Sequence, residues 1–435
     1  MQPALRWTLR LAAKYGDTFR LRVLGPRHRS EPSWRSMVPR TVVIVSSPSH
    51  LREVFLRSGD ELRSGEAREF IAWHMGSDAI AVLDGAAHRA ERQALGGFLR
   101  RTTTPEFEGR LRTAIQQGFA GWPDQGTVSL GPRIERVGLE AILTGLFGPL
   151  GTEAMAQLCR LVDHGAITTT VSPQTMVLPI LQTDFGPWSP GGRLRRTVDK
   201  FEAFVLSRLA VADGGLVRES REELSHREGS SEFDTALLVQ RVRTLLAGWQ
   251  PTATTLVWLC YHVLRDVAIR DRVVEAARSE SLEGRKFLDA VCLETLRLNL
   301  PFLGAFRRVS SPTTFGGIAW QEGTLILPAL LLTHRRSDLF ADPAEFRPER
   351  FLSRRPSSCE YAPFGGGVRY CLGDQLALVQ MRVVLTELLR AFDIEPVGQW
   401  SNHEMRRGTM LVARDPLKVR VRRRESRSWS PLSAK

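Results

Sequence analysis

The sequence predicts a mainly α-helical protein with a small β portion, and three observations support this fold class. The middle third, about 133 to 263, is rich in predicted helix. Residues 303 to 330 alternate and contain Gly316-Gly317, which is typical of short strands joined by turns. No internal repeat and no low-complexity linker divides the chain. We therefore predict a single domain over residues 1–422, followed by a basic tail over 423–435.

The first part of the chain predicts a mixture of strands and helices. Thr18 to Val23 and Thr41 to Val45 have the composition of strands, and Ser46-Ser47-Pro48 predicts the start of a helix. An amphipathic helix is predicted from Asp84 to about Phe98. Breaks in the helix-rich part are predicted at Ser189-Pro190-Gly191-Gly192 and in the polar stretch from Asp213 to Ser231.

The second part ends in helices that flank a Pro-, Gly- and Ser-rich coil. A helix around Leu288 to Leu298 ends before Pro301, and residues 340 to 370 show little periodicity. A long apolar helix is predicted from about Asp374 to Phe392. The last 45 residues read as strands plus a basic tail.

From Thr244 to Val263 the chain contains no Asp, Glu, Lys or Arg, which is about the length of a membrane span. The same stretch contains four Thr, Gln250, Pro251 and His262. A long helix buried inside a large domain produces this pattern too, and we favour that interpretation over a span.

Composition narrows the class of protein. The net charge is +13, but the basic residues are scattered apart from the tail, which argues against a nucleic-acid interface. An odd number of cysteines without a CxxC pair argues against a disulfide framework and a zinc site. We find no signal peptide or anchor, so a reducing cytoplasm is the expected location. The cysteines are Cys159, Cys260, Cys292, Cys359 and Cys371.

The sharpest feature is the glycine-rich loop from Phe364 to Gly373, which lies between the coil and the apolar helix. It lacks both phosphate-binding patterns, GxGxxG and GxxxxGK[ST]. An inert buried cysteine is one reading of Cys371. The alternative is a thiolate ligand, because a helix N-terminus lowers a thiol pKa and glycines let backbone N–H groups approach the sulfur. Arg369 is placed to pair with a carboxylate of a bound cofactor.

This loop resembles the haem-binding signature of the cytochromes P-450, F-x-x-G-x-R-x-C-x-G. Every signature position is filled, by Phe364, Gly367, Arg369, Cys371 and Gly373. The resemblance implies the cytochrome P-450 fold, haem b (iron protoporphyrin IX) as cofactor and Cys371 as the axial ligand of the iron. It extends over most of the chain, from about residue 12 to 422.

Two further groups of residues match the same family. Glu294 and Arg297 are three apart on one helix face, and Phe346-Arg347-Pro348-Glu349-Arg350-Phe351 resembles the family's meander. The resemblance implies a buried structural triad of Glu294, Arg297 and Arg350. His88 and Arg92 share a helix face, and the family's matching positions contact the haem propionates. Arg307 resembles another propionate contact.

The chain departs from the family where a long helix should cross the open face of the haem. The sequence there is Ala247-Gly248-Trp249-Gln250-Pro251-Thr252, with Gln250 at the usual acid position and Pro251 at the usual alcohol position. Gln250 does not titrate near neutral pH, and Pro251 has no hydroxyl and no N–H. Pro251 is expected to kink the helix. Ordered water and Thr252 are the expected replacements for the proton relay.

The resemblance implies a monooxygenase that inserts one oxygen atom from dioxygen into an apolar small molecule of terpene, fatty acyl or polyketide type, in secondary metabolism. Gln250-Pro251 keeps open a peroxide-dependent or oxygen-independent enzyme. A haem sensor or electron carrier is a third reading, and persistent six-coordinate, CO-insensitive iron would favour it. The expected substrate walls are residues 65–83, 165–190, 245–252, 303–306 and 405–411, including Ile80, Trp249, Leu303, Ala305, Phe306 and Met410.

The expected electron donor is a separate ferredoxin or flavodoxin with its reductase, because the chain shows no reductase domain and no membrane anchor. A basic patch near the thiolate would suit an acidic donor. We expect a monomer that does not bind nucleic acid.

Overall fold

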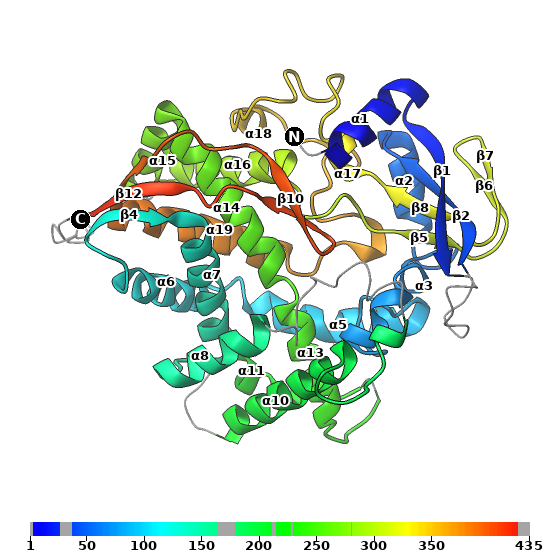
Figure 1. Ribbon diagram of the computed structural model, residues 1–435, viewed down its shortest axis with the longest axis horizontal. Coiled ribbons are helices and arrows are strands. Elements are labelled where there is room, and N and C mark those ends of the chain that lie inside the picture. The colour runs from blue at the N-terminus through cyan, green and yellow to red at the C-terminus, as the bar shows by residue number, and fades with distance from the viewer. Residues whose placement is uncertain are drawn as a thin grey trace.

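The computed structural model describes residues 3–26, 37–163, 179–210, 215–227, 229–279 and 281–424. It confirms the predicted class, which is mainly helical with a small β portion. Figure 1 shows the helices filling the left and lower parts of the molecule, while β1, β2, β5 and β8 form a sheet on the right.

In chain order, the described helices are α1 (Pro3–Tyr15), α2 (Pro48–Arg57), α3 (Ser64–Ala67), α4 (Ala72–Met75), α5 (Gly85–Arg101), α6 (Pro105–Ala120), α7 (Leu130–Phe147), α8 (Thr152–Leu161), α10 (Pro190–Ala210), α11 (Leu216–Glu219), α12 (Arg221–Ser225), α13 (Thr235–Leu246), α14 (Trp249–Arg265), α15 (Val267–Ser279), α16 (Leu282–Leu298), α17 (Leu330–Thr333), α18 (Arg350–Ser353) and α19 (Asp374–Ala391). The short 3-10 helices are η2 (Glu69–Ile71), η4 (Pro179–Leu181) and η5 (Gly367–Arg369).

The strands form separate small sheets. The five-stranded sheet has the order β1-β2-β8-β5-β3, and β2 pairs with β8 in parallel, with Val42 opposite Leu325. A second sheet has the order β4-β12-β9, so the last strand of the sheet region, β12, pairs with β4 from much earlier in the sequence and with β9. The bounds are β1 (Thr18–Pro26), β2 (Met37–Val45), β3 (Leu62–Arg63), β4 (Gln125–Ser129), β5 (Arg307–Val309), β6 (Thr313–Phe315), β7 (Ile318–Trp320), β8 (Leu325–Pro328), β9 (Phe392–Pro396), β10 (Glu404–Arg407), β11 (Met410–Ala413) and β12 (Lys418–Arg423).

The main hydrophobic core surrounds α14, which runs through the middle of the helical part (Figure 1). Leu256, Trp258 and Leu264 on this helix are almost fully buried. Gly138 on α7 allows close packing, because a Cβ there would lie 3.0 Å from the Leu256 side chain. The buried environment explains why this stretch carries no charge. No described helix is long and apolar enough to cross a membrane.

The uncharged stretch is not one continuous helix. The structure ends α13 at Leu246 and begins α14 at Trp249, so the helix is interrupted at Ala247 and Gly248, in the turn before Pro251. Pro251 is the third residue of α14, where an N–H has no partner within the helix in any case. Its ring excludes the carbonyl four residues earlier, which is that of Ala247, so the break falls one turn before the proline.

Two predicted loops contain helices. The Ser189-Pro190 pair starts α10, because the Ser189 hydroxyl accepts a hydrogen bond from the N–H of Gly192 (3.1 Å) and proline suits the first helical position. The described part of 213–231 forms α11 and α12. Of the basic tail, residues 425–435 lie outside the described residues, and Arg423 closes β12.

Candidate active site

The glycine-rich loop presents Cys371 directly before α19. The N–H of Cys371 donates to the carbonyl of Phe364 (2.9 Å), which closes the loop. Gly367 has a φ of +64°, and a Cβ there would lie 2.1 Å from the carbonyl oxygen of Phe55 on α2. Only glycine fits this combination of backbone conformation and contact. The loop is therefore held against α2 in one conformation.

Cys371 differs from the other cysteines in its surroundings. It is exposed, whereas Cys159, Cys260 and Cys292 are buried. Desolvation still raises the pKa of the Cys371 thiol, while the N–H of Gly373 and the charge of Arg92 act in the opposite direction. A sulfur that is both accessible and desolvated lies in a recess of the protein. A metal ion at this position would lower the thiol pKa and favour the thiolate.

Basic side chains from three parts of the chain gather near this loop. His88 on α5 is buried, and Arg92 on the same helix donates to the carbonyl of Tyr370 (2.6 Å). Arg307 on β5 donates to the hydroxyls of Ser58 (3.0 Å) and Ser64 (3.2 Å). Arg369 donates to the carbonyl of Ile80 (3.1 Å) and forms an ion pair with Asp84.

A fifth basic residue, Arg68, belongs to the same cluster. Burial, and after it the neighbouring charge of Arg369, lower the pKa of Arg68 to about 10. Burial lowers the pKa of Arg307 to about 9, with Arg68 and Arg369 as the repelling neighbours. The pKa of His88 falls to about 4, first through burial and then through the nearby arginines, so this histidine is neutral at pH 7.

The cluster has the charge that a dicarboxylate requires. Arg68, Arg307 and Arg369 carry three positive charges, and Asp84 is the carboxylate that acts on all of them, which leaves a surplus of two. Buried cations in excess are costly unless an anion joins them. A flat cofactor with two carboxylates, such as haem, therefore fits beside Cys371.

Asp84 was predicted only as the start of a helix. Its carboxylate does not cap α5 but accepts the N–H groups of Ser64 (3.1 Å), Gly65 (3.0 Å) and Glu66 (2.9 Å). It thereby fixes the start of α3 next to the cysteine loop. Neither Asp84 nor Arg68 stands in the haem-binding signature, so the sequence offered no signal for their place in the cluster.

The predicted oxygen-side residues lie together at the start of α14. The hydroxyl of Thr252 donates to the carbonyl of Gly248 (2.9 Å), and Thr255 donates in the same way to Pro251 (2.9 Å). Gln250 is buried, whereas Gly248 is exposed at the break. Thr252 is thus the hydroxyl held directly at the break, one residue after the position where the family normally carries it.

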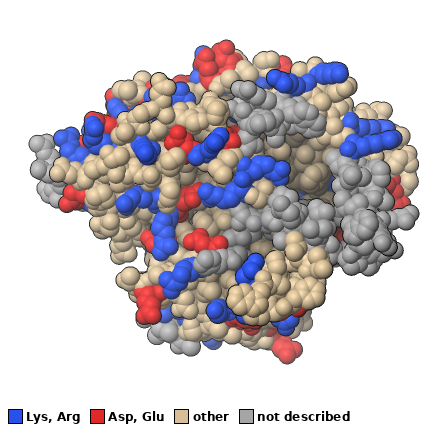
Figure 2. All heavy atoms as spheres, viewed as in Figure 1, with Lys and Arg blue, Asp and Glu red and all other residues tan. Residues whose placement is uncertain are grey.

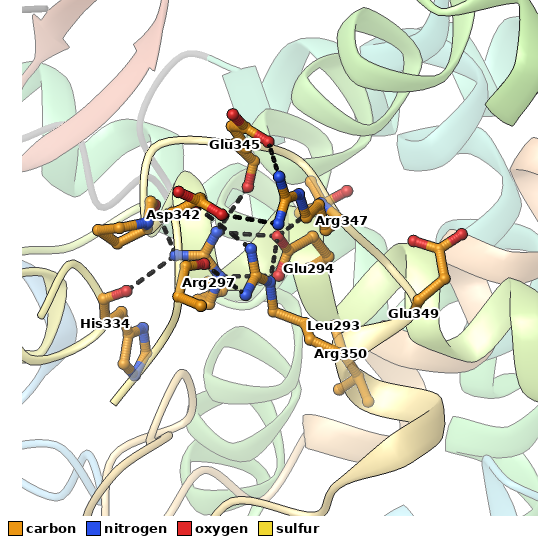
Figure 3. A network of polar contacts seen from close by, with 12 residues as sticks. Leu293, Glu294, Arg297, His334, Asp342, Glu345, Arg347, Glu349 and Arg350 are labelled. Atoms are coloured by element: carbon orange, nitrogen blue, oxygen red, sulfur yellow. Dashed lines mark hydrogen bonds and ion pairs between the residues drawn. The ribbon is translucent and has the colours of Figure 1, made fainter. Parts of the chain in front are cut away.

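Glu294, Arg297 and Arg350 meet in a buried network, shown in Figure 3. The Glu294 carboxylate accepts from Arg297 Nε (2.7 Å) and Arg350 Nε (3.0 Å), and also from the backbone N–H of Arg347 (2.8 Å). Arg297 donates further to the carbonyls of His334, Pro343 and Glu345. The network ties α16 to the coil that leads into the cysteine loop.

His334 extends this connection towards Cys371 and was not predicted. Its Nε2 accepts the N–H of Ala362 (2.9 Å), and its ring lies 5.0 Å from that of Tyr361. Burial lowers the pKa of His334 to about 3, which keeps the ring neutral and able to accept. The histidine therefore supports the segment immediately before Phe364.

The sequence analysis also did not predict a second buried ion pair. Arg241 on α13 holds both carboxylate oxygens of Glu91 on α5, with the shortest contact at 2.7 Å. The same guanidinium donates to the carbonyls of Leu224 (3.0 Å) and His226 (2.9 Å). Since Glu91 lies between His88 and Arg92, this pair fixes the helix of the basic cluster to the helix that ends at the Ala247-Gly248 break.

The residues predicted to line the substrate site differ in how far they are buried. Ile80 and Trp249 pack partly buried against the main core, and Leu303, Ala305 and Phe306 are half-buried near β5. Met410 on β11 is buried. Of the predicted wall at 165–190, residues 165–178 lie outside the described residues.

The chain is similar to several known proteins. A sequence model described as cytochrome P450 matches residues 215–421. A Mycobacterium tuberculosis protein with the provisional name cytochrome P450 135B1 is 26% identical, over 97% of this chain and 88% of its own. Another from the same organism, provisionally named cytochrome P450 138, is 27% identical over 88% of this chain and 87% of its own.

Two solved structures resemble the chain in fold. A cyanobacterial protein, CYP120A1 with bound retinoic acid, has a TM-score of 0.74 at 21% identity and covers 95% of this chain and 93% of its own. A zebrafish cytochrome P450 with progesterone has a TM-score of 0.76 at 18% identity, with 98% and 100% covered. At these identities the likeness concerns the fold alone.

Proposed function

Because this chain belongs to the cytochrome P450 superfamily, we propose that it is a haem-thiolate monooxygenase with Cys371 as the axial ligand. The family implies an oxidoreductase with a haem-iron cofactor, and we propose haem b. The observation that carries the proposal is the accessible Cys371 thiol beside buried basic side chains with two surplus charges. When bound, haem supplies the redox chemistry that cleaves the O–O bond.

The chain's own residues have distinct roles towards that cofactor. Cys371 binds the iron as a thiolate, and the N–H of Gly373 stabilises the negative sulfur. Arg307, Arg369 and Arg92 with His88 bind the two carboxylates, and Arg68 adds a further charge. Phe364 and Gly367 shape the loop that holds the sulfur in place.

On the oxygen side we propose that Thr252 replaces the missing acid and alcohol. Its hydroxyl already binds the carbonyl of Gly248, so an ordered water placed there would complete a path for protons. Ala247 and Gly248 are small enough to leave room for dioxygen. A peroxide-dependent reaction is the second candidate, because Gln250 and Pro251 lack the groups that normally organise proton delivery.

The substrate that we propose is an apolar small molecule of terpene, fatty acyl or polyketide type, oxidised in secondary metabolism. The half-buried apolar residues Ile80, Trp249, Leu303 and Phe306 support this choice. The fold neighbours with bound retinoic acid and with progesterone are consistent with it, since the greater part of both ligands is hydrocarbon.

We propose that electrons come from a separate ferredoxin or flavodoxin in the cytoplasm, because proteins of this family usually use redox partners. Figure 2 shows Lys and Arg spread over the visible face with Asp and Glu among them, so a broad electrostatic attraction to an acidic donor is expected. A reduction rate that does not change with salt would contradict this part of the proposal.

The test of the function is isotopic. The purified haem-loaded protein is incubated with a panel of terpenes, fatty acids and polyketides, once with labelled dioxygen and an electron-supply system and once with labelled peroxide. Label from dioxygen in the product supports the monooxygenase, and label only from peroxide supports the second candidate. Conversion without label in either reaction contradicts both.

A further inference from the structure

A surface groove lies between the end of α6, the strand β4 and the first half of α7, which are neighbours at the left of Figure 1. Its volume is about 560 Å³, which is within the usual range for a small-molecule site. None of its lining residues belongs to the site proposed for haem or for substrate. The polar and aromatic part of the lining consists of Trp122, Thr127, Ser129, Arg133, Arg136 and Glu140.

The aromatic wall of the groove is part of a stack of four side chains. The Arg133 guanidinium lies over the Trp122 ring, with 5.6 Å between the guanidinium and the ring centre. Trp122 stacks on Phe392, and the two ring centres are 5.4 Å apart. The Arg423 guanidinium lies 4.7 Å from the centre of the Phe392 ring. Because Trp122 is buried, its indole is a fixed platform that holds Arg133 at the groove.

The arginines around this platform differ in their counter-charges. Arg423 Nε donates to the Asp124 carboxylate (2.6 Å). Arg136, inside the groove, pairs with Glu140 (2.5 Å). Arg133 forms no ion pair with any residue that the structure describes, and its recorded side-chain contact is with the Trp122 ring. The lining of the groove therefore has a formal charge of +1, and that charge lies on Arg133.

The strand β4 adds open backbone groups, because it is an outer strand of its sheet. The N–H of Leu130, directly after β4, donates to the carbonyl of Leu417 (2.9 Å). Pairing alternates along an antiparallel ladder, so the backbone groups of Thr127 point away from β12. The Thr127 side chain is exposed as well. An N–H group and a hydroxyl at the edge of the groove are thus available to an anion.

A second groove has a similar size and the opposite charge. It lies on α15, has a volume of about 520 Å³, and is lined by Asp271, Glu275 and Arg278 together with Val274 and Ser279. The formal charge of this lining is −1, and it contains no aromatic side chain. Size alone therefore does not mark an anion site. The groove on α15 serves as an internal control for the groove beside Trp122.

We propose that the groove between α6, β4 and α7 binds a small organic anion through Arg133. A guanidinium binds two oxygens of a carboxylate or a phosphate at once, and stacking on a ring leaves the N–H groups at its edge free to donate. The apolar body of the ligand packs beside Trp122 and the buried side chains of Val128 and Val137. This site goes beyond the proposed function, and its occupancy does not depend on turnover.

The test is a titration of the haem-loaded protein, labelled with fluorotryptophan and followed by fluorine NMR. The probes are benzoate and phenyl phosphate, which carry the two kinds of anionic group. Benzyl alcohol is the neutral control, because it has the same ring without a charge. The Trp122 resonance is assigned from its loss in Trp122→Phe. The haem absorbance is recorded in the same samples, since a probe that binds near Cys371 would change the haem band.

We expect a saturable shift of the Trp122 resonance with at least one of the two anions, at an unchanged haem band. Benzyl alcohol should bind at least about tenfold more weakly, because it cannot make a charged pair with Arg133. A response to phenyl phosphate alone identifies the ligand class as a phosphate, and a response to benzoate alone identifies it as a carboxylate. Either result supports the site.

The variants separate Arg133 from other arginines. Arg133→Gln should weaken anion binding at least about tenfold, whereas Arg133→Lys keeps the charge and should stay within about fivefold of the parent protein. Arg278→Gln, in the groove on α15, should change binding by less than about twofold. Thermal unfolding of each variant shows that the fold is kept, and the lysine variant tests the charge even where the glutamine variant is unstable.

Three results overturn the proposal. The first is the absence of a saturable Trp122 shift with both anions. The second is an equal loss of binding in Arg133→Gln and Arg278→Gln, which would show non-specific attraction to a basic protein. The third is a Trp122 shift that benzyl alcohol produces as strongly as the anions, because Arg133 would then have no part in binding.

Discussion

The segment before Cys371 and the break between α13 and α14 are stabilised in opposite ways. The first is held by buried charges and hydrogen bonds, with Glu294, Arg297, Arg350 and His334 joining α16 to the coil before the cysteine. The second results from a missing hydrogen bond at Pro251, and the hydroxyls of Thr252 and Thr255 donate to backbone carbonyls there. The segment before Cys371 is therefore held by buried charge pairs between distant parts of the chain, whereas the break is a local effect of one proline.

The largest effect is expected at the sulfur itself. Cys371→Ser removes the thiolate that we propose as axial ligand, so turnover should fall by more than about 100-fold, beyond the usual effect of changing an outer-shell partner. The thiolate-type spectrum of the reduced CO complex should also disappear. Cys359→Ser is the control, and a loss of the same spectrum in that variant would contradict the assignment.

The next effect concerns the stability of the network before the cysteine. Glu294→Gln leaves the fully buried Arg297 without its counter-charge, so the free energy of unfolding should fall by about 3–5 kcal/mol. Urea denaturation measures this change. The control is Glu349→Gln, at a half-exposed pair with Arg272, where the expected change is below about 1 kcal/mol. Equal losses of unfolding free energy at both positions would contradict the stabilising role assigned to the buried network.

A smaller effect is expected at Asp84, and it should depend on the cofactor. Asp84→Asn removes the one negative charge facing Arg68, Arg307 and Arg369, so the haem-free protein should lose about 1–3 kcal/mol of stability. The haem-loaded protein should lose less, because the cofactor carboxylates supply counter-charge. Thermal unfolding with and without haem measures the difference, and identical losses in both forms would exclude a role in the dicarboxylate site.

His334 should make stability depend on pH. Its pKa of about 3 in the folded state is below the unfolded value of about 6.5, so the unfolded state binds more protons between these limits. Stability is therefore complete above about pH 6.5 and is lost as the pH falls, by up to about 1.4 kcal/mol per pH unit from this group. His334→Gln should flatten the slope measured between pH 4.5 and 6.5. The exposed His403→Gln should leave it unchanged.

The smallest effect is expected at the break. Because Pro251 lies in the first turn of α14, Pro251→Ala should change the free energy of unfolding by less than about 1 kcal/mol, unlike a proline inside a helix. The double change Gln250→Glu with Pro251→Thr should improve the coupling of electrons to product if proton delivery limits the reaction. Unchanged coupling would contradict the role proposed for these positions.

Local patterns predicted most of the secondary structure with small errors at the ends. The helix predicted around Leu288 starts earlier in the structure, because Ser281 caps it through the N–H of Gly284 (3.0 Å). The strands predicted at Thr18 and Thr41 are longer, since β1 and β2 pair along their whole length. The kink expected from Pro251 lies at Ala247 and Gly248, because the proline ring excludes the carbonyl four residues earlier.

By itself, the sequence predicted the fold class, the resemblance to the cytochromes P-450 and the role proposed for Cys371, because these predictions depend on residue types at fixed short spacing. Only the tertiary structure identified Asp84, Arg68, Glu91 with Arg241, and His334. Their partners are distant in sequence, by 150 residues for Glu91 and Arg241 and by 285 for Asp84 and Arg369. Such contacts form where packing brings separate segments together, and a buried charge then requires whichever partner the fold places beside it.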